Sequence, residues 1–436
     1  METVKFHWGK FAILSFAIIA VFVYAMLTSG DIPPPDTSDF QVARPSIPGL
    51  PDEEAILNSD QNAFVHLQHA AKVVDFPQNL KTRLEQDEAD PHLVRDIVSR
   101  NEKTYELFAQ AAQSQFLVTP RKQNETDEEP LAFTRKELTR LLSYKLQGER
   151  GKDEQCETTA GNILKIGKLC HTYPHSIFQW LIGYNFQVWA MAEFRELVRR
   201  SEMPESVLLD FTADLITKEQ IDNSFQYAVK NDYWLFISSI DEALSPYVKS
   251  EKGDGHWLNL VMRRYSYKPN QTKTTLLNCY RDVLESREVS WAELQLTHIR
   301  RISKSNIVET GRALATGNLT GKYIVVSVCP ALERVVSAKY QLEAETVITR
   351  TVVACQLYRR QYGRLPNALE DLVPELIDQS PLDPFDGLPL RYDKEKAIIY
   401  SVGRDAIDSG GSTTPRDPMR QTPVGPWLAE DAVFFL

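Results

Sequence analysis

Cysteine is scarce in this sequence, and the few cysteines present form no familiar motif. The chain has five cysteines in 436 residues, too few and too widely spaced for a disulfide scaffold. No CxxC or CxxCH occurs, which argues against a redox-active pair and a c-type haem. Cys156 and Cys170 can form a disulfide bond if they lie outside the cytoplasm. For most of the five we expect small, buried apolar residues.

An excess of positive charge is also missing. The chain carries 49 lysines and arginines against 59 aspartates and glutamates, a formal net charge of −10. Its arginine pairs, such as Arg199-Arg200 and Arg359-Arg360, are scattered among acidic residues, as on solvated helix faces. Because phosphate binding needs clustered lysine and arginine, we expect no nucleic-acid partner.

The common catalytic and nucleotide-binding motifs are absent as well. The sequence has no GxSxG or SxxK around a nucleophile, and no glycine-rich loop of the GxxxxGK[ST] or GxGxxG type. His66 and His69 lie three residues apart, but no HExxH accompanies them. Pro174 interrupts the helical spacing of His171 and His175. We therefore predict structural roles for these histidines, although a site assembled from distant residues leaves no mark in one sequence.

One long apolar run is almost uninterrupted. Residues 11–27, "FAILSFAIIAVFVYAML", contain no charge, and as a helix they span about 25 Å, close to the hydrocarbon thickness of a bilayer. Lys5 and Lys10 precede the run and Asp31 follows it, so the positive-inside rule places the N-terminus in the cytoplasm. We predict a single-pass helix in the inner (cytoplasmic) membrane, with the bulk of the chain extracytoplasmic, in the periplasm. A cleaved signal peptide is the alternative.

A second apolar stretch, residues 177–194, is better interpreted as a buried helix. Gln179, Asn185, Gln187 and Glu193 interrupt it on several faces, which disfavours a membrane span. We expect its aromatic side chains to pack in a core, and a groove for a partner helix or an apolar ligand is the alternative. These aromatic residues are Trp180, Tyr184, Phe186, Trp189 and Phe194.

Composition divides the chain into four parts, and the expected fold is mainly α. The membrane anchor occupies residues 1–29. A proline-rich linker of polyproline type follows in residues 30–54. Residues 55–337 show a helical period and predict an extracytoplasmic domain of α-helical hairpins or a bundle. Residues 338–436 predict a small α+β module.

Several segments of the helical domain are specific enough to check. Helices are expected at 218–244, 271–285, 290–303 and 331–362. The β-branched run 323–328, "YIVVSV", is compatible with one strand or with the start of the next helix.

The last hundred residues change in character. The long helix ends at Gly363, a favoured residue after a helix C-terminus. Asn367, with an acidic residue three positions later, has the spacing of a capping box and predicts a new helix. Two short runs, 388–392 and 397–401, flank "DKEK" and predict a β-hairpin. A glycine-flanked acidic loop, "VGRDAIDSGG", follows.

These C-terminal segments resemble a known family. In order, "YRRQYGRLPNALEDLVPEL", "DPFDGLPLRY" and "IIYSVGRDAIDSGG" are similar to the C-terminal domain of G-type pseudopilins of type II secretion systems. Phe385 stands where the family's DPWG-like turn has tryptophan. The loop positions that match the family are Ser401, Gly403, Asp405, Gly410 and Gly411.

The resemblance covers less than a quarter of the chain. The sequence before the apolar run, "METVKFHWGKFAIL", has no prepilin cleavage motif, and some 300 residues of helical sequence precede the module. We therefore do not expect polymerisation as a pilus subunit. The overall layout resembles single-anchor bacterial envelope proteins with a pseudopilin-like tail.

The acidic loop is a candidate calcium site. Asp405 and Asp408, with Ser401 nearby, supply the hard oxygen ligands that calcium prefers, and the pseudopilin resemblance implies calcium in this loop. A turn without metal is the alternative, because aspartate and glycine also form turns through side-chain caps and positive φ angles. Arg404 is then available to neutralise the acids.

Taken together, these patterns favour a binding or scaffold function over catalysis. We expect a membrane-anchored extracytoplasmic protein of the bacterial envelope that binds an envelope protein partner, with secretion or pilus assembly as the context that the resemblance implies. The alternative is an envelope enzyme of hydrolase type whose active site is dispersed in the helical domain.

Overall fold

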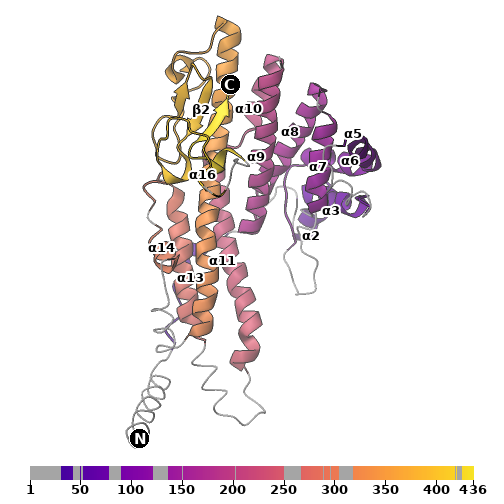
Figure 1. Ribbon diagram of the computed structural model, residues 1–436. Helices are drawn as coiled ribbons and strands as arrows, with labels where there is room; N and C mark the ends of the chain where they lie inside the picture. The colour runs from indigo at the N-terminus through magenta and orange to yellow at the C-terminus, as the bar shows by residue number, and fades with distance from the viewer. Residues whose placement is uncertain are drawn as a thin grey trace, which may run out of the picture. The chain divides into compact units, whose positions relative to one another are not determined.

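Helices dominate the computed structural model, as the sequence periodicity predicts (Figure 1). The structure describes residues 31–42, 50, 53–77, 90–120, 136–149, 151–201, 203–249, 267–287, 289–294, 296–303, 318–417, 419 and 425–436. The helices are α2 (Glu53–Leu57), α3 (Ala63–Val73), α5 (Pro91–Arg100), α6 (Glu102–Ala112), α7 (Lys136–Gly148), α8 (Asp153–Cys170), α9 (Ile177–Arg200), α10 (Glu205–Asp214), α11 (Lys218–Lys249), α13 (Pro269–Leu284), α14 (Thr297–Ser303) and α16 (Leu319–Tyr362).

The predicted membrane anchor lies outside the described residues. Within the described ranges, no helix combines the length and apolar character that a membrane crossing requires. This finding includes α9, which contains the second apolar stretch.

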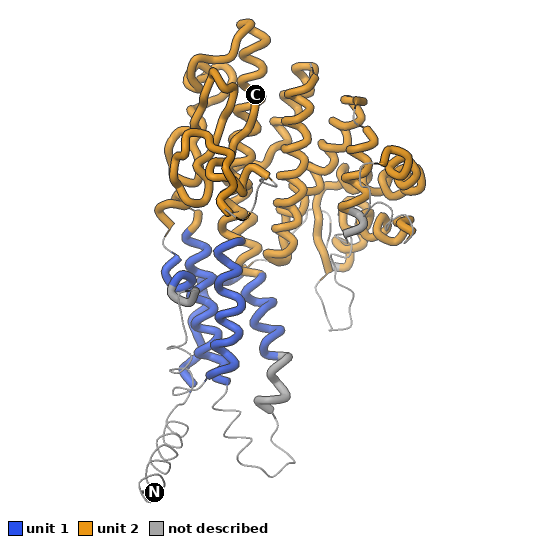
Figure 2. Tube along the Cα trace, viewed as in Figure 1, with its two compact units in different colours: residues 1–41, 232–285, 295–334 blue, residues 42–231, 286–294, 335–436 orange. Residues whose placement is uncertain are grey.

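The chain divides into two compact units that alternate along the sequence (Figure 2). The division falls inside α11 and again inside α16, and the predicted domain border after residue 337 also lies inside α16. Unit 1 consists of residues 1–41, 232–285 and 295–334, and unit 2 consists of residues 42–231, 286–294 and 335–436.

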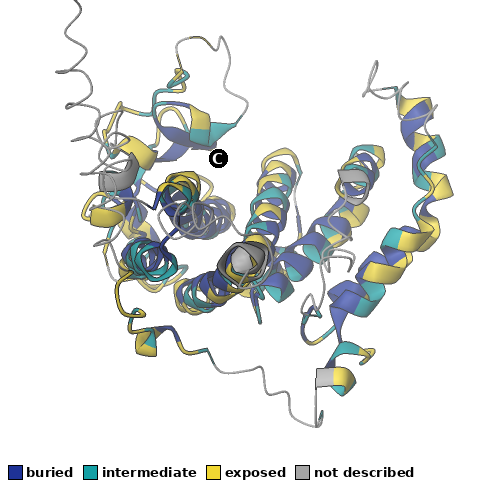
Figure 3. Ribbon diagram, turned by 90° about the horizontal axis from the view of Figure 1, so that it is seen from below, coloured by how far each residue is buried: buried dark blue, intermediate teal, exposed yellow. Residues whose placement is uncertain are grey.

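Helices of unit 2 pack through buried apolar faces and leave their other faces exposed (Figure 3). The aromatic residues of α9 form much of this core, as predicted. Trp180 is fully buried, stacks on His171 with ring centroids 4.7 Å apart, and meets Phe225 of α11 edge to face. Phe194 stacks on Phe211 of α10. Phe186 is also buried.

Two glycines let α8 and α9 approach closely. An added Cβ at Gly167 of α8 would lie 2.9 Å from the carbonyl oxygen of Gly183 in α9 and 3.0 Å from the backbone nitrogen of Gln187. Since both neighbours are backbone atoms, neither can move aside without shifting a helix. The absence of a side chain is therefore what sets the distance between these helices.

Replacing Gly167 with alanine is expected to lower the free energy of unfolding by about 1–3 kcal/mol, because the new methyl group overpacks the contact. Gly161 lies on the same helix, and a Cβ there meets no atom within 4 Å. Gly161→Ala is the matched control, with an expected gain of up to about 1 kcal/mol from helix propensity. Urea unfolding of the two variants measures the difference, and equal stabilities would contradict the close contact.

In unit 1, the first described residues pack against α11 and α13. Phe40, in the 3₁₀ turn η1 (Ser38–Phe40), is fully buried and meets the Tyr233 ring with centroids 5.1 Å apart. The Trp234 indole nitrogen donates to the Phe40 carbonyl oxygen at 2.9 Å. Arg281 of α13 pairs with Asp39 at 2.8 Å. This part of the predicted proline-rich linker is thus attached to the helices.

The predicted hairpin of the C-terminal module is confirmed, and a third strand joins it. Strands β1 (Arg391–Asp393) and β2 (Ile398–Ser401) pair antiparallel, and β3 (Ala432–Phe435) pairs antiparallel with β2 on its other side. Figure 1 shows this small sheet beside α16. The sequence analysis missed β3, whose four residues are all apolar and show no alternation.

Phe385 of the "DPFDG" turn is fully buried at the base of the module. Its ring lies among those of Trp291, Tyr340 and Trp427, with centroid distances of 5.6–6.4 Å. The turn therefore supplies the aromatic residue that holds the module to α16.

The structure decides one alternative that the sequence left open and contradicts two local predictions. "YIVVSV" is helical, as part of α16. The helix predicted over 290–303 is observed only in its second half, as α14. Its first half is not helical because the backbone nitrogens of Trp291 and Ala292 donate hydrogen bonds to the carbonyl oxygens of Pro384 and Phe385. The capping box at Asn367 does not form: a 3₁₀ turn, η4 (Leu369–Leu372), starts after Ala368.

All five cysteines are buried and free. The predicted role as buried apolar residues is confirmed, and Cys156 and Cys170 do not form a disulfide bond in this structure.

Candidate functional site

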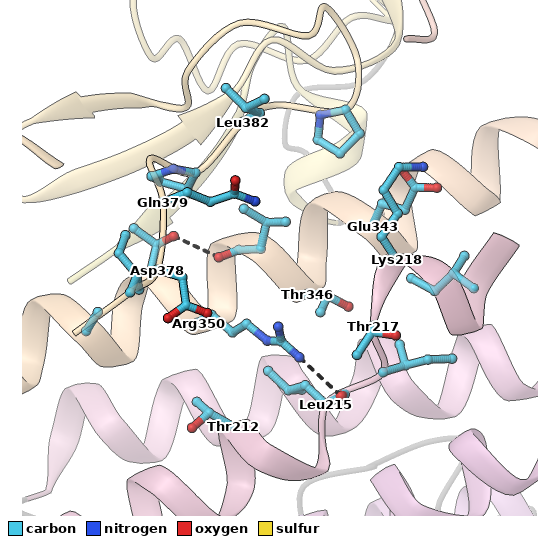
Figure 4. Close-up of a pocket in the computed structure, with 18 of the residues that line it drawn as sticks. Thr212, Leu215, Thr217, Lys218, Glu343, Thr346, Arg350, Asp378, Gln379 and Leu382 are labelled. Carbon is cyan, nitrogen blue, oxygen red and sulfur yellow. Dashed lines mark hydrogen bonds and ion pairs between the residues drawn. The ribbon is translucent and has the colours of Figure 1, made fainter. Parts of the chain in front are cut away.

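A cleft of about 940 Å³ opens in unit 2. Three segments enclose it (Figure 4). The end of α10 and the start of α11 form one wall, α16 forms a second, and a loop of the C-terminal module, residues 376–387, forms the third. This volume lies within the range typical of small-molecule binding sites.

Apolar side chains line much of the cleft, and two of them remain exposed to solvent. Leu209 of α10 is 49% exposed and Leu382 of the loop is 52% exposed. Large apolar side chains held open in this way offer surface that a ligand can cover. Further apolar lining comes from Leu215, Ile216, Val347, Leu357, Leu376 and Ile377.

Arg350 of α16 reaches into the cleft from one side (Figure 4). Its Nη2 donates to the carbonyl oxygen of Leu215 at 3.2 Å. Its Nε is buried and has no hydrogen-bond partner within the described part of the chain. Burial lowers the pKa of the guanidinium below its ordinary value, and the charge of Asp378 partly opposes this shift. No described carboxylate lies within ion-pair distance of Arg350.

Lys168 of α8 lies near the same end of the cleft. Its Nζ donates to the carbonyl oxygen of Asp214, the last residue of α10, at 3.1 Å. Arg350 binds the next carbonyl oxygen, that of Leu215. Both cations thus bind the C-terminal end of α10, where the helix dipole is negative.

An ionic quartet, buried except for the exposed Lys218, closes the other side of the cleft. Lys339 of α16 lies 2.7 Å from both Asp222 and Glu343, and it donates to the Ser286 carbonyl oxygen at 2.6 Å. Lys218, at the start of α11, pairs with Asp222 at 2.8 Å and lies 3.6 Å from Glu343. The quartet of Lys218, Asp222, Lys339 and Glu343 joins α11 to α16.

Glu343 is a member of the quartet whose pKa is shifted. Burial raises the pKa of its carboxyl, and the charges of Lys339 and Lys218 act in the opposite direction. Because both cations stay close, Glu343 is held as an ion-pair partner rather than as a free proton donor. Its structural role is to fix α16 where it lines the cleft.

The cleft offers binding groups but no recognisable nucleophile. No histidine or cysteine is among its described lining residues. The hydroxyl of Ser290 donates to Glu293 at 2.9 Å within a local turn. Asp383 is fully buried, and its carboxylate accepts bonds from Ser401 and from the backbone nitrogens of Phe385 and Val402.

The three predicted calcium ligands have separate partners. The Ser401 hydroxyl donates to Asp383 at 2.9 Å. Asp405 accepts from Arg416 at 3.2 Å. Asp408 accepts from Arg391 at 3.3 Å, from the Tyr400 hydroxyl and from a backbone nitrogen.

Asp431, which the sequence analysis missed, holds the acidic loop in place. It is fully buried and accepts bonds from the backbone nitrogens of Ser409, Gly411 and Ser412, the shortest at 2.8 Å. Its only sequence signal is its position just before the apolar run that becomes β3. The loop conformation thus has an explanation that requires no metal.

Calcium binding in this loop stays a prediction. No group of three or more histidine, cysteine or acidic side chains is close enough to hold a metal in the portion that the structure describes. If calcium binds, Asp405 and Asp408 must exchange their arginine partners for the ion, so we expect a weak affinity, on the order of 0.1–1 mM. Calorimetry on the full chain tests this. If calcium titration releases no heat of binding and a chelator does not lower the melting temperature, the loop is a turn without metal.

His66 and His69, the other metal candidates, do not converge on acidic groups. The His66 ring nitrogen lies 3.0 Å from the backbone oxygen of Asp60, and His69 is exposed. His171 is buried against Trp180. The structural roles predicted for these side chains agree with these contacts.

No protein-family model, curated protein or solved structure matches the chain significantly. The pseudopilin resemblance of residues 338–436 therefore rests on the sequence motifs alone.

Proposed function

We propose that this protein is a membrane-anchored binding protein of the bacterial cell envelope, and that the cleft in unit 2 is its binding site. The cleft is the observation that carries the proposal: it combines a ligand-sized volume, exposed apolar side chains and an arginine that pairs with no carboxylate in the described part of the chain. The apolar run at residues 11–27 and the charges around it support the membrane anchor and the extracytoplasmic position.

The contacts around the cleft support binding in a preformed site. The ionic quartet fixes α11 against α16, and Phe385 fixes the loop side of the C-terminal module. Walls held in this way need little rearrangement when a ligand enters, which lowers the entropic cost of binding. The pseudopilin-like module then serves as one wall of the site, which agrees with a binding or scaffold role and needs no polymerisation.

Photo-crosslinking in living cells tests the proposal. A benzophenone amino acid is placed at Leu382 or Leu209, which line the cleft, and at Ile407 as a control that is exposed outside it. After irradiation, intact-mass spectrometry of the purified chain should show an adduct of defined mass at the two cleft positions and none at residue 407. Absence of an adduct at both cleft positions, or equal labelling at Ile407, would overturn the proposal.

A further inference from the structure

Arg350 and Lys168 are two cations of the cleft that bind a backbone carbonyl oxygen, and no ion pair joins either to a carboxylate among the described residues. By contrast, the buried cations Arg195 and Lys339 of unit 2 have carboxylate partners at short distance: Arg195 lies 2.6 Å from Glu345, and Lys339 lies 2.7 Å from Glu343. Half-buried Arg350 has, among the described residues, the carbonyl oxygen of Leu215 as its hydrogen-bond partner. A partly buried charge is costly unless an opposite charge or several hydrogen bonds accompany it.

Capping of α10 explains only part of this arrangement. One N–H of Nη2 serves the Leu215 carbonyl oxygen, but the Nε–H is buried and unpartnered among the described residues. The Nε is closed off from solvent, whereas Nη1 has no hydrogen-bond partner among the described residues and is not enclosed in the same way. Nη1 is therefore the part of the guanidinium available for a charge-assisted hydrogen bond to a carboxylate.

The apolar surface of the cleft is the second, independent observation. Leu209 and Leu382 belong to segments far apart in sequence, yet both line the cleft and both are about half exposed. An anion without an apolar part would leave these side chains in water. A ligand with an apolar chain would cover them and gain roughly 25 cal/mol for each Å² removed from water.

We infer that the cleft binds a small monocarboxylate with an apolar chain, its carboxylate on the guanidinium of Arg350 and its chain against Leu209 and Leu382. This inference rests on the proposed function and names the ligand class for the same site. Asp378 lines the cleft near Arg350. Its negative charge disfavours a dianion such as a phosphate monoester more than a singly charged carboxylate.

Four probes, three of them with the same eight-carbon chain, separate the contributions of charge and chain. Octanoate carries both features, octanol lacks the charge, octylammonium reverses it, and acetate lacks the chain. Calorimetric titrations use the full chain in lipid nanodiscs, with empty nanodiscs as the blank. We expect octanoate to bind at least about tenfold more tightly than each of the other three, since a charge-assisted hydrogen bond and a buried chain each contribute this much.

Variants of α16 test whether Arg350 supplies the charge that binds the carboxylate of octanoate. Arg350→Met should weaken octanoate binding about tenfold or more and leave octanol binding unchanged. Arg350→Lys keeps the charge without the planar edge and should recover only part of the affinity. Arg360→Met, an exposed arginine on the same helix, is the matched control and should bind octanoate as the parent does. Melting temperatures confirm that each variant is folded.

The outcomes separate this inference from the proposed function. Equal binding of octanoate and octanol, or an Arg350→Met variant that binds octanoate normally, would overturn the inference that the ligand is a carboxylate. The cleft would still stand as a binding site. If no probe binds while Leu382 still forms an adduct in cells, the ligand class is wrong and the site stands. If neither binding nor an adduct is found, both proposals fail. Even if Arg350→Met does not fold, the comparison of probes on the parent chain decides the inference.

Discussion

Replacing Arg195 with alanine is expected to lower the free energy of unfolding by about 3–5 kcal/mol, because it leaves a buried carboxylate without its partner. Arg195 of α9 is 9% exposed and Glu345 of α16 is 2% exposed, with 2.6 Å between Nη2 and Oε2. Arg195 also donates to the hydroxyl of Thr349. Without the guanidinium, the carboxylate of Glu345 stays buried and loses its charged partner.

The effect should extend into the C-terminal module. The Trp427 indole nitrogen donates to the second oxygen of Glu345 at 2.7 Å, and the Arg195 guanidinium lies 4.7 Å from the centre of the Phe434 ring. Glu345 therefore links α9 to α16 and to the module. We expect the fluorescence of the tryptophans to report the loss of this contact during unfolding.

Arg199→Ala provides the matched control. Arg199 lies four residues further along α9, is 51% exposed, and pairs with Glu196. An exposed ion pair of this kind contributes at most about 1 kcal/mol. Urea unfolding of both variants measures the difference, and a loss at Arg195 no larger than that at Arg199 would show that the buried pair does not stabilise the fold.

Acid is expected to destabilise the protein through His171, by up to about 3 kcal/mol. Burial lowers the pKa of His171 from 6.5 to about 4 in the folded state. Its Nε2 lies 2.8 Å from the carbonyl oxygen of Trp180, and its Nδ1 lies 3.1 Å from the side-chain nitrogen of Gln187. These partners fit a neutral ring that donates from Nε2 and accepts at Nδ1.

The direction of the pH effect follows from the two pKa values. Between pH 6.5 and 4 the unfolded chain binds a proton at His171 and the folded chain does not, so stability falls as the pH drops through this range. Above pH 6.5 the ring is neutral in both states, and below pH 4 it is protonated in both. The contribution is therefore complete at neutral pH and lost in acid.

A variant separates the contribution of His171 to the pH dependence from those of other groups that titrate in acid. His171→Gln should lose the part of the pH dependence that lies between pH 4 and 6.5, whatever its stability at pH 7. His69→Gln removes an exposed histidine from α3 and should keep the parent slope. The measurement is the urea midpoint as a function of pH. Parallel curves for the parent and His171→Gln would contradict a neutral, buried His171.

Much of the helical architecture was predictable because it depends on local periodicity. The helix over 218–244 appears as the first part of α11, and Asn62 caps α3 through a bond from the Phe64 backbone nitrogen. Tertiary contacts decided the exceptions. The β-branched run at 323–328 is helical within α16, so its local strand preference was overridden. The start of the predicted helix at 290 is lost to backbone bonds with the "DPFDG" turn.

The candidate site itself could not be predicted from the sequence. Its charged residues, Lys168, Lys218, Glu343, Arg350 and Asp378, come from positions up to 210 residues apart, and each looks like an ordinary surface charge in its own segment. The acidic loop was recognisable because its aspartates, Asp405 and Asp408, lie only three positions apart in sequence. Its main organiser, Asp431, lies about twenty residues away and becomes visible only when β3 joins the sheet.

The short stretch "KYQLEAETVITR", residues 339–350 of α16, supplies three separate sets of side-chain contacts within twelve positions. Lys339 and Glu343 belong to the ionic quartet, Glu345 and Thr349 bind Arg195, and Arg350 enters the cleft. Deleting one residue from a helix turns everything beyond it by about 100°, so no insertion or deletion within this stretch can preserve all three sets of partners. Relatives of this chain should therefore be recognisable by a fixed spacing, K-x3-E-x-E-x3-T-R, even where the residues between have changed.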